Sequence, residues 1–290
     1  MSIRVFVIGD PHFKAKNIRE GELFIRRCLD QAKRCDPDLI VLLGDVLDTH
    51  EIVNVYAHNL AYTFIDGLSE IAKTCILVGN HDMANPNIFL TQMHVFNPFK
   101  KWKNVIVVDA PTVVTEKDIS LKSVSDTESE SSLFDNEETE FEDSEIRFVL
   151  CPYTPPGRFQ EALDMVPDWQ SATCIFAHQE FQGCKMGPII STEGDVWDES
   201  YPIVISGHVH DEQVIDNVYY IGSSIQHSFA ESCNKYIWLA TFFKGETVPN
   251  IDKIDLGMEK KKIISMDIND IAKFDVKRTE NAIIKLSLRG

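Results

Sequence analysis

The sequence lacks the marks of a membrane or secreted protein. No stretch approaches the roughly 18 consecutive apolar residues that a membrane-spanning helix needs, and the hydrophobic fraction of 44% is ordinary for a globular chain. Residues 1–10 read as a β-branched strand rather than as a leader that ends in a cleavage site. We therefore expect an intracellular protein of the cytoplasm or nucleus, with no signal peptide, no transmembrane segment and no membrane contact.

Paired cysteines are also missing. The chain has seven cysteines, an odd number, and none of them forms a Cys-x-x-Cys pair. Cys75, Cys151 and Cys174 sit inside apolar runs. This pattern argues against a disulfide framework and a cysteine-based zinc site, and it predicts buried thiols in a reducing compartment.

Basic residues are scarce, and the imbalance is local. The net charge is −17, and ten acidic residues with no basic one lie between Asp126 and Glu145. This run has no sustained apolar period, so we expect a solvated, self-repelling and mobile insertion at 116–145. A functional tail is the less favoured reading, although serines beside acidic residues suit an acid-directed kinase.

Apolar runs alternate with helical patterns in the first half of the chain. Apolar residues recur at helical spacing over Leu23–Lys33 and Val55–Ala72. The expected strands of the chain are Ile3–Gly9, Leu39–Leu43, Cys75–Val78, Val105–Val108, Ile146–Leu150, Cys174–Ala177, Ile203–Ser206, Val218–Ile221 and Tyr236–Phe243. The strand–helix order predicts an α/β protein, and the strand-rich second half predicts a second sheet packed on the first.

We expect one large domain at 1–250 and a C-terminal extension at 251–290. The extension contains a basic run, Glu259–Lys262, and two apolar segments that read as strands, Ile263–Met266 and Ile283–Leu288. Because the sequence stops directly after the second of these segments, either the chain is short or a further, truncated domain begins here.

Five short motifs, each at the end of an apolar run, carry the residues that point to chemistry. They are Gly9–His12, Gly44–Asp48, Gly79–Asp82, Ala177–Gln179 and Gly207–His210. Parallel strands deliver their last residues to one crevice at the rim of a sheet, so we expect these side chains to converge. The glycine before each ligand is expected to let the backbone turn sharply.

The residue types suit divalent metal ions. Carboxylates, imidazoles and an amide oxygen favour Mn²⁺, Fe, Zn²⁺ or Mg²⁺. Two such ions can share a hydroxide and clamp a phosphoryl group. Asp45 is the best candidate for a bridging carboxylate. The predicted metal ligands are Asp10, His12, Asp45, Asn80, His178, His208 and His210.

Two further residues of the motifs are expected to act beside the metals. His81 is positioned to donate a proton to a leaving oxygen or to stabilise the transition state, and Asp48 is the expected carboxylate partner that orients it. Residues that bind the substrate are not identifiable. His50, His58, His94 and His227 lie outside such a context and are expected to be surface or packing residues.

Together the five motifs resemble those of the calcineurin-like metallophosphoesterase superfamily, over about Ile3 to Phe243. The resemblance implies a four-layer α/β/β/α sandwich of two mixed sheets with flanking helices. It implies one metal held by Asp10, His12, Asp45 and His210, and a second held by Asp45, Asn80, His178 and His208. Hydrolysis would proceed by attack of a metal-bridging hydroxide on the phosphodiester.

Segments around two motifs resemble the DNA-repair nucleases of the SbcD type and phage recombination endonuclease subunits. These segments are Ile175–Gly183 and the Gly-Ser turn within Tyr219–Gln226. The resemblance implies a Mn²⁺-dependent DNA exonuclease or endonuclease that acts in repair or recombination, forms a homodimer and pairs with an SMC-like ATPase. It implies that Ala282–Gly290 begins a capping domain.

Two alternatives remain open from the residues. One is a phosphatase or small-nucleotide phosphodiesterase with the same metals. The other is a binding protein with a degenerate site, which the complete ligand set disfavours. Basic clusters at Lys14–Arg19 and Lys100–Lys103 lie near the motifs, as DNA binding would require, but they read equally well as solvated surface.

Overall fold

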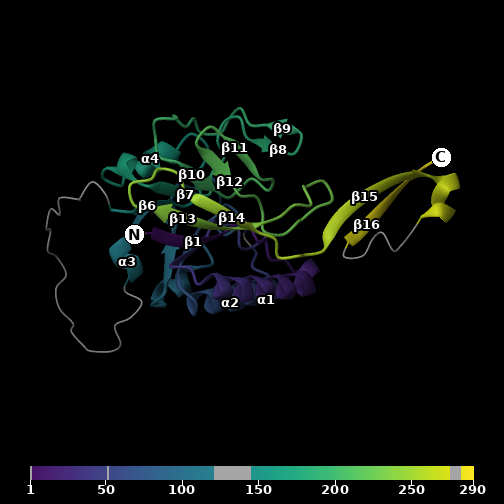
Figure 1. Cartoon of the computed structure of the whole chain (residues 1–290), viewed down its shortest axis with the longest axis horizontal. Coiled ribbons are helices and arrows are strands. Elements are labelled where there is room, and N and C mark those ends of the chain that lie inside the picture. Colours follow the sequence, from purple (N-terminus) through teal and green to yellow (C-terminus); the bar gives the residue numbers. More distant parts are fainter. Residues whose placement is uncertain (1, 51, 121–144, 275–281) are drawn as a thin grey trace.

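Two six-stranded sheets form the centre of the computed structural model, which describes residues 2–50, 52–120, 145–274 and 282–290 (Figure 1). The first sheet is built on four parallel strands, with two antiparallel strands added at one edge. Its order is β14 (Asn250–Ile254), β13 (Ile237–Phe243), β1 (Ser2–Ile8), β2 (Leu39–Leu42), β3 (Lys73–Leu77) and β4 (Val105–Val108).

The second sheet is also mixed. Four strands in its middle run parallel, and an antiparallel strand closes each edge. Its order is β11 (Gln213–Ile215), β12 (Val218–Tyr220), β10 (Val204–Ser206), β7 (Cys174–Ala177), β6 (Arg147–Cys151) and β5 (Thr112–Thr115).

Alternation along β1 shows how the layers are packed. Val5 and Val7 belong to the apolar layer between the two sheets, whereas Phe6 and Ile8 belong to the layer under the helices. Successive residues of a strand point to opposite faces, so a strand with apolar residues at every position is buried on both. The continuous apolar runs of the sequence are therefore the inner strands of a sandwich.

Two long helices cover the outer face of the first sheet. Figure 1 shows α1 (Ile18–Cys35) and α2 (Val55–Ser69) side by side beneath it. Phe24 and Phe64 are fully buried there with ring centroids 5.4 Å apart, and each contributes about 1.5–3 kcal/mol through burial. The side chain of Asn54 caps the start of α2 by accepting hydrogen bonds from two backbone N–H groups.

The outer face of the second sheet has a thinner cover. It consists of α4 (Phe159–Leu163), the 3₁₀ turn η4 (Trp169–Ser171) and loops, packed on Ile175 and Val204. The short helix α3 (Glu116–Ser120) follows β5. The predicted four-layer arrangement of two mixed sheets with flanking helices is confirmed. Within the described part of the chain, no helix is both long and apolar enough to cross a membrane.

A two-stranded parallel arm extends from the sandwich after β14. It pairs β15 (Lys260–Asp267) with β16 (Ala282–Arg289), and the 3₁₀ helix η5 (Ile268–Lys273) follows β15 (Figure 1). The first sheet runs on to Ile254, so the extension expected at 251–290 corresponds to the arm and the residues leading into it. Its identity as the start of a capping domain stays a prediction. The acidic run lies outside the described residues, except for Glu145.

Candidate metal centre

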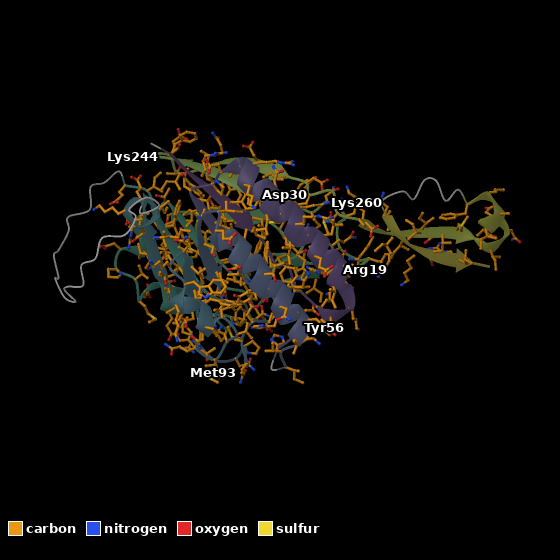
Figure 2. The ribbon with its side chains drawn as sticks, turned by 90° about the horizontal axis from the view of Figure 1, so that it is seen from below. Arg19, Asp30, Tyr56, Met93, Lys244 and Lys260 are labelled. Atoms are coloured by element: carbon orange, nitrogen blue, oxygen red, sulfur yellow. The ribbon has the colours of Figure 1, made fainter. Side chains whose placement is uncertain are left out.

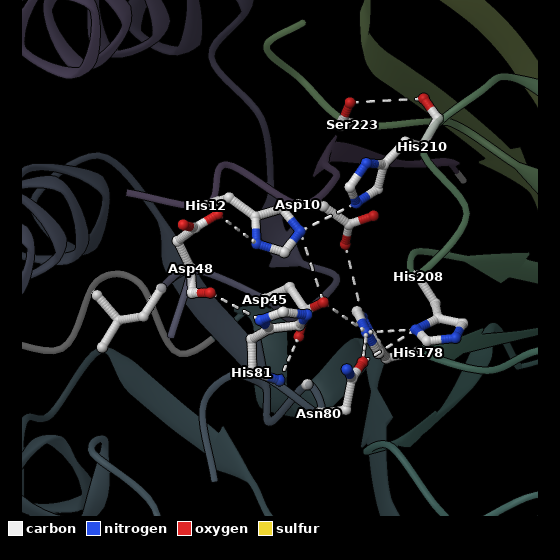
Figure 3. A network of polar contacts seen from close by, with 12 residues as sticks. Asp10, His12, Asp45, Asp48, Asn80, His81, His178, His208, His210 and Ser223 are labelled. Atoms are coloured by element: carbon white, nitrogen blue, oxygen red, sulfur yellow. Dashed lines mark hydrogen bonds and ion pairs between the residues drawn. The ribbon is translucent and has the colours of Figure 1, made fainter. Parts of the chain in front are cut away.

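The ends of five strands bring the motifs together at one edge of the sandwich. The chain leaves β1 at Asp10, β2 at Asp45 and β3 at Asn80 in the first sheet, and β7 at His178 and β10 at His208 in the second. Figure 3 shows these side chains with His12, Asp48, His81 and His210 in one polar network. The structure brings all nine predicted residues together, whereas their individual roles stay predictions.

Asp45 lies at the middle of this network. Its Oδ2 is 3.6 Å from His12 Nε2 on one side and 3.3 Å from His178 Nε2 on the other. Its Oδ1 accepts a hydrogen bond of 2.8 Å from the backbone N–H of His81. The carboxylate therefore faces two separate groups of ligand atoms, as a bridging ligand must.

The first group lies around His12. Its Nε2 is 3.0 Å from Nε2 of His210. The carboxylate of Asp10 is fully buried, with Oδ1 3.5 Å from Nδ1 of His178 and no side-chain hydrogen bond among the described residues. A buried carboxylate with so few partners is costly unless a cation neutralises it.

The second group lies around Asn80. Its Oδ1 is 2.9 Å from His208 Nδ1 and 3.0 Å from His178 Nε2. His178 donates from Nδ1 to the carbonyl oxygen of Leu43 at 2.6 Å. In the neutral ring this bond leaves Nε2 without a proton and directed at the group, which is how proteins orient a metal-binding imidazole.

The donor set fits two divalent cations. Ligand atoms that share one ion at about 2.0–2.1 Å lie about 3 Å apart, close to the separations of 2.9–3.6 Å found here. Suitable ligand atoms gather in two groups, His12–Asp45–His81 and Asp45–His178–His208, which have Asp45 in common. A nitrogen of His81 therefore also lies within reach of the first group, although we expected this residue beside the metals.

Burial dominates the electrostatics of the site. It raises the pKa of Asp10 to about 6, an effect that His178 opposes and the neighbouring Asp45 carboxylate reinforces. Burial also lowers the pKa of His12, so that this ring is held in the neutral form that binds metals. Both shifts show that burial favours the uncharged forms of these two groups at the site.

Most glycines of the motifs are required because a side chain would not fit, and not because the backbone has a positive φ. Among the four motif glycines only Gly44 has a positive φ, of 104°. A Cβ atom at Gly79 would lie 2.3 Å from Asp45 Oδ1, and one at Gly207 would lie 2.7 Å from Asp10 Oδ1. The expected sharp turn falls instead on ligands themselves, because the φ angles of Asp10, His12, Asp45 and His208 are 29°, 43°, 47° and 73°.

Asp48 contacts His81 through a different atom from the one we expected. The ring Nδ1 of His81 donates to the main-chain carbonyl oxygen of Asp48 at 2.9 Å. The carboxylate of Asp48 accepts instead from Lys14 Nζ, also at 2.9 Å. The predicted carboxylate partner is therefore wrong, since any residue at position 48 offers the same carbonyl group.

Two histidines that the sequence did not mark border the site. His50 stacks on His81 with ring centroids 4.2 Å apart and an interplanar angle of 25°. His227 donates from Nε2 to the carbonyl oxygen of Asp10 at 3.0 Å, and its ring centroid is 4.9 Å from that of His12. The signals available were weak: His50 is two residues after Asp48, and His227 follows the Gly-Ser turn.

Comparisons with known proteins agree with this centre. The family model for calcineurin-like phosphoesterases matches residues 3–212. The chain is 39% identical to "Putative phosphoesterase 244L" of Invertebrate iridescent virus 6, over 99% of this chain and 94% of that protein. It is 38% identical to "Putative phosphoesterase 078R" of Invertebrate iridescent virus 3, over 99% of this chain and 76% of that protein.

Solved structures are more distant. GAP50, described as the anchor in the inner membrane complex of Plasmodium, aligns at 11% identity with a TM-score of 0.43, over 87% of this chain and 88% of that one. The family model, in contrast, covers the strands and motifs that build the metal centre, and both viral relatives match along nearly the whole chain. This chain therefore belongs to the calcineurin-like phosphoesterases.

Proposed function

We propose that this phosphoesterase is a dinuclear metal phosphodiesterase that cuts DNA, with Mn²⁺ as its preferred ion. Asp10, His12, Asp45 and His210 would hold one cation. Asn80, His178 and His208 would hold the second together with Asp45. When bound, the two ions supply neutralisation of the phosphate charge and a lowered pKa of water.

The remaining chemistry falls to His81. Hydrolysis forms a bond from the oxygen of water to phosphorus and breaks the bond from phosphorus to the leaving oxygen, which must gain a proton. His81 lies at the centre, and the main-chain carbonyl of Asp48 fixes its Nδ1–H at 2.9 Å. The other ring nitrogen, Nε2, is then the atom that delivers the proton.

A basic surface beside the centre carries the proposal of a nucleic-acid substrate. Lys261 at the base of the arm donates to Glu20 of α1 at 2.9 Å, and its backbone N–H donates to the side chain of Gln226 at 2.6 Å. These contacts place Lys261 against the start of α1 and beside Gln226, the neighbour in sequence of His227, which touches Asp10. Figure 2 shows Arg19 and Lys260 at the same end of the core.

We call this surface the basic path and define it as Lys14, Lys16, Arg19, Lys260 and Lys262. Lys16, Arg19 and Lys262 are exposed, whereas Lys14 pairs with Asp48 and leads toward His81. Ten of the acidic residues lie in the run 126–145, so the rest of the chain contributes −7 of the net charge of −17.

The first experiment compares substrates in the presence of Mn²⁺. Double-stranded DNA, single-stranded DNA, RNA and bis(p-nitrophenyl) phosphate should all be offered to the same preparation. We expect cleavage of DNA that Asp45→Ala and His178→Ala abolish. Hydrolysis of the small diester without cleavage of any DNA would refute the nuclease assignment and favour the small-nucleotide phosphodiesterase.

The second experiment tests the basic path. The double substitution Lys260→Glu with Lys262→Glu should weaken DNA binding and lower the slope of log K against log salt by about 1.8, since each lost phosphate contact removes about 0.9. A matched control is Lys244→Glu with Lys103→Glu, because both residues are exposed and both lie away from the centre: Lys244 is at the opposite end of the core (Figure 2), and Lys103 precedes the start of β4, whereas the centre lies beyond the ends of the parallel strands. Hydrolysis of the small diester should stay unchanged in both variants.

A further inference from the structure

A second feature, distinct from the basic path, opens beside His81. It is a cleft of about 230 Å³ lined by the loops that follow β2 and β3. Its apolar walls are Val53, Met83, Ala84, Met93 and Val95. Met93 is 70% exposed and Val53 is 45% exposed, so both lie at the mouth and the cleft is open to solvent.

Hydrogen bonds within the protein hold the wall of the cleft in place. The backbone N–H of Ala84 donates to the carbonyl of Met93 at 3.0 Å, and Met83 forms a β-bridge with His94. The side chain of His94 is buried, with Nε2 3.1 Å from the carboxylate of Asp109 and Nδ1 accepting from a backbone N–H. A pre-formed wall is what a ligand subsite needs, because little ordering remains to be done on binding.

Apart from His81 at its edge, the described residues that line the cleft bring no charged group that is free to meet a ligand. Its only carboxylate, that of Asp82, is buried and accepts from the backbone N–H groups of Leu47 and Gly79 at 3.0 Å each. A second phosphate or a carboxylate would lose its hydration there and meet no cation other than His81, which the proposed function already engages with the leaving oxygen. The cleft therefore favours an uncharged, largely apolar group, directly beside a centre that takes a phosphate.

The position of the cleft beside His81 decides which part of a substrate can enter it. His81 lines the cleft and, in the proposed function, delivers the proton to the leaving oxygen. A group attached through that oxygen must continue past His81. In a nucleic acid the uncharged and flat part of the leaving nucleotide is its base.

We propose that the cleft beside His81 binds the unpaired base of the nucleotide that carries the leaving oxygen, an inference that rests on the proposed function. At 230 Å³ the cleft is smaller than the roughly 300–1,000 Å³ of sites for drug-sized ligands, so it takes one base and not a base pair. The scissile bond must then lie in a single strand or at a frayed end.

An abasic scan tests this assignment. Labelled single strands carry one abasic residue at successive positions, and kcat/KM is measured for each bond with Mn²⁺. A missing base should slow cleavage about ten-fold to hundred-fold at one bond only. That base should belong to the nucleotide whose fragment ends in the free hydroxyl. A base missing on the phosphate side of the same bond should have a much smaller effect.

Two variants test the cleft itself. Ala84→Trp fills it, and Met93→Asp places a charge at its mouth; both positions are exposed, so the fold should tolerate the changes. Each should bring the intact strand down to the rate of the strand abasic at the leaving nucleotide. The matched controls are Ile88→Trp and Ile88→Asp, because Ile88 is 46% exposed on the same loop and does not line the cleft.

The outcomes separate this inference from the proposed function. Strand cleavage that does not depend on the leaving base, or variants that slow intact and abasic strands equally, would overturn the base site and leave the nuclease intact. Hydrolysis of bis(p-nitrophenyl) phosphate without cleavage of any strand would overturn both and leave only a phosphoesterase.

Discussion

Gly79→Ala should disable the metal centre by moving the bridging carboxylate. An alanine Cβ at this position would lie 2.3 Å from both the backbone nitrogen and Oδ1 of Asp45. Ordinary contacts of carbon atoms begin near about 3.5 Å, so Asp45 must shift by about 1 Å. Its Oδ1 also accepts from His81 at 2.8 Å, and the shift would therefore reach the proposed proton donor.

The expected size of the effect follows from that displacement. A misplacement of about 1 Å in a catalytic group costs about 100-fold in rate. Overpacking of a well-filled region costs about 1–3 kcal/mol of folding free energy, which lowers the melting temperature by about 2–4 °C per kcal/mol in a domain of this size. We therefore expect a folded protein with weaker metal binding and at most about one hundredth of the activity.

The assay combines metal content, melting temperature and hydrolysis of bis(p-nitrophenyl) phosphate. Gly67→Ala is the matched control, because its Cβ would lie 2.7 Å from Cδ1 of Leu29, the end of a flexible side chain away from the metals. The control should keep its metals and its activity. If Gly79→Ala retained full metal content and full activity, the close packing of this glycine against Asp45 would not matter for function.

Three further predictions follow from contacts in and around the centre. Chelation should abolish hydrolysis and lower the melting temperature of the wild type, since ligands at 100 times their Kd contribute about 2.7 kcal/mol; Asp45→Asn should show little change on chelation. Asp48→Asn keeps the main-chain carbonyl that holds His81 and should cost less than about ten-fold in kcat, whereas His81→Asn should cost about 100-fold or more; equal losses would contradict the main-chain contact. Asp82→Ala should lower the free energy of unfolding by about 2–5 kcal/mol in urea titrations, because it leaves the buried N–H groups of Leu47 and Gly79 without an acceptor. Asp82→Asn keeps an acceptor oxygen and should lower the free energy of unfolding by less.

Much of the fold was predictable because the inner strands have a distinctive sequence pattern. A strand buried on both faces is apolar at every position, and the expected Leu39–Leu43 matches β2 to within one residue. The edge strand β14 gave no such signal, since its five residues are half-exposed or exposed and three of them are polar. Its existence depends on pairing with β13, which is a property of the neighbour rather than of its own sequence.

The part of the site that lies at strand ends was predictable, whereas the contacts made through main-chain atoms were not. Strand ends placed Asp10, Asp45 and His178 correctly because topology alone brings such residues together. No rule of spacing could find His227, which follows the last of the motifs by many residues and reaches the site through the carbonyl of Asp10. The contact of His81 with a main-chain oxygen was equally hidden, because a carbonyl group is present at every position.

The left-handed backbone of four predicted ligands has a consequence for how this protein would respond to selection. Such a conformation costs about 1–2 kcal/mol for a residue with a side chain, and Asp10, His12, Asp45 and His208 all adopt it. The sum is a sizeable part of the 5–15 kcal/mol, approximately, that holds a typical domain together. Selection for heat resistance in the presence of a chelator should therefore favour glycine at these positions, because bound metal then no longer offsets the backbone strain, and such variants would be inert.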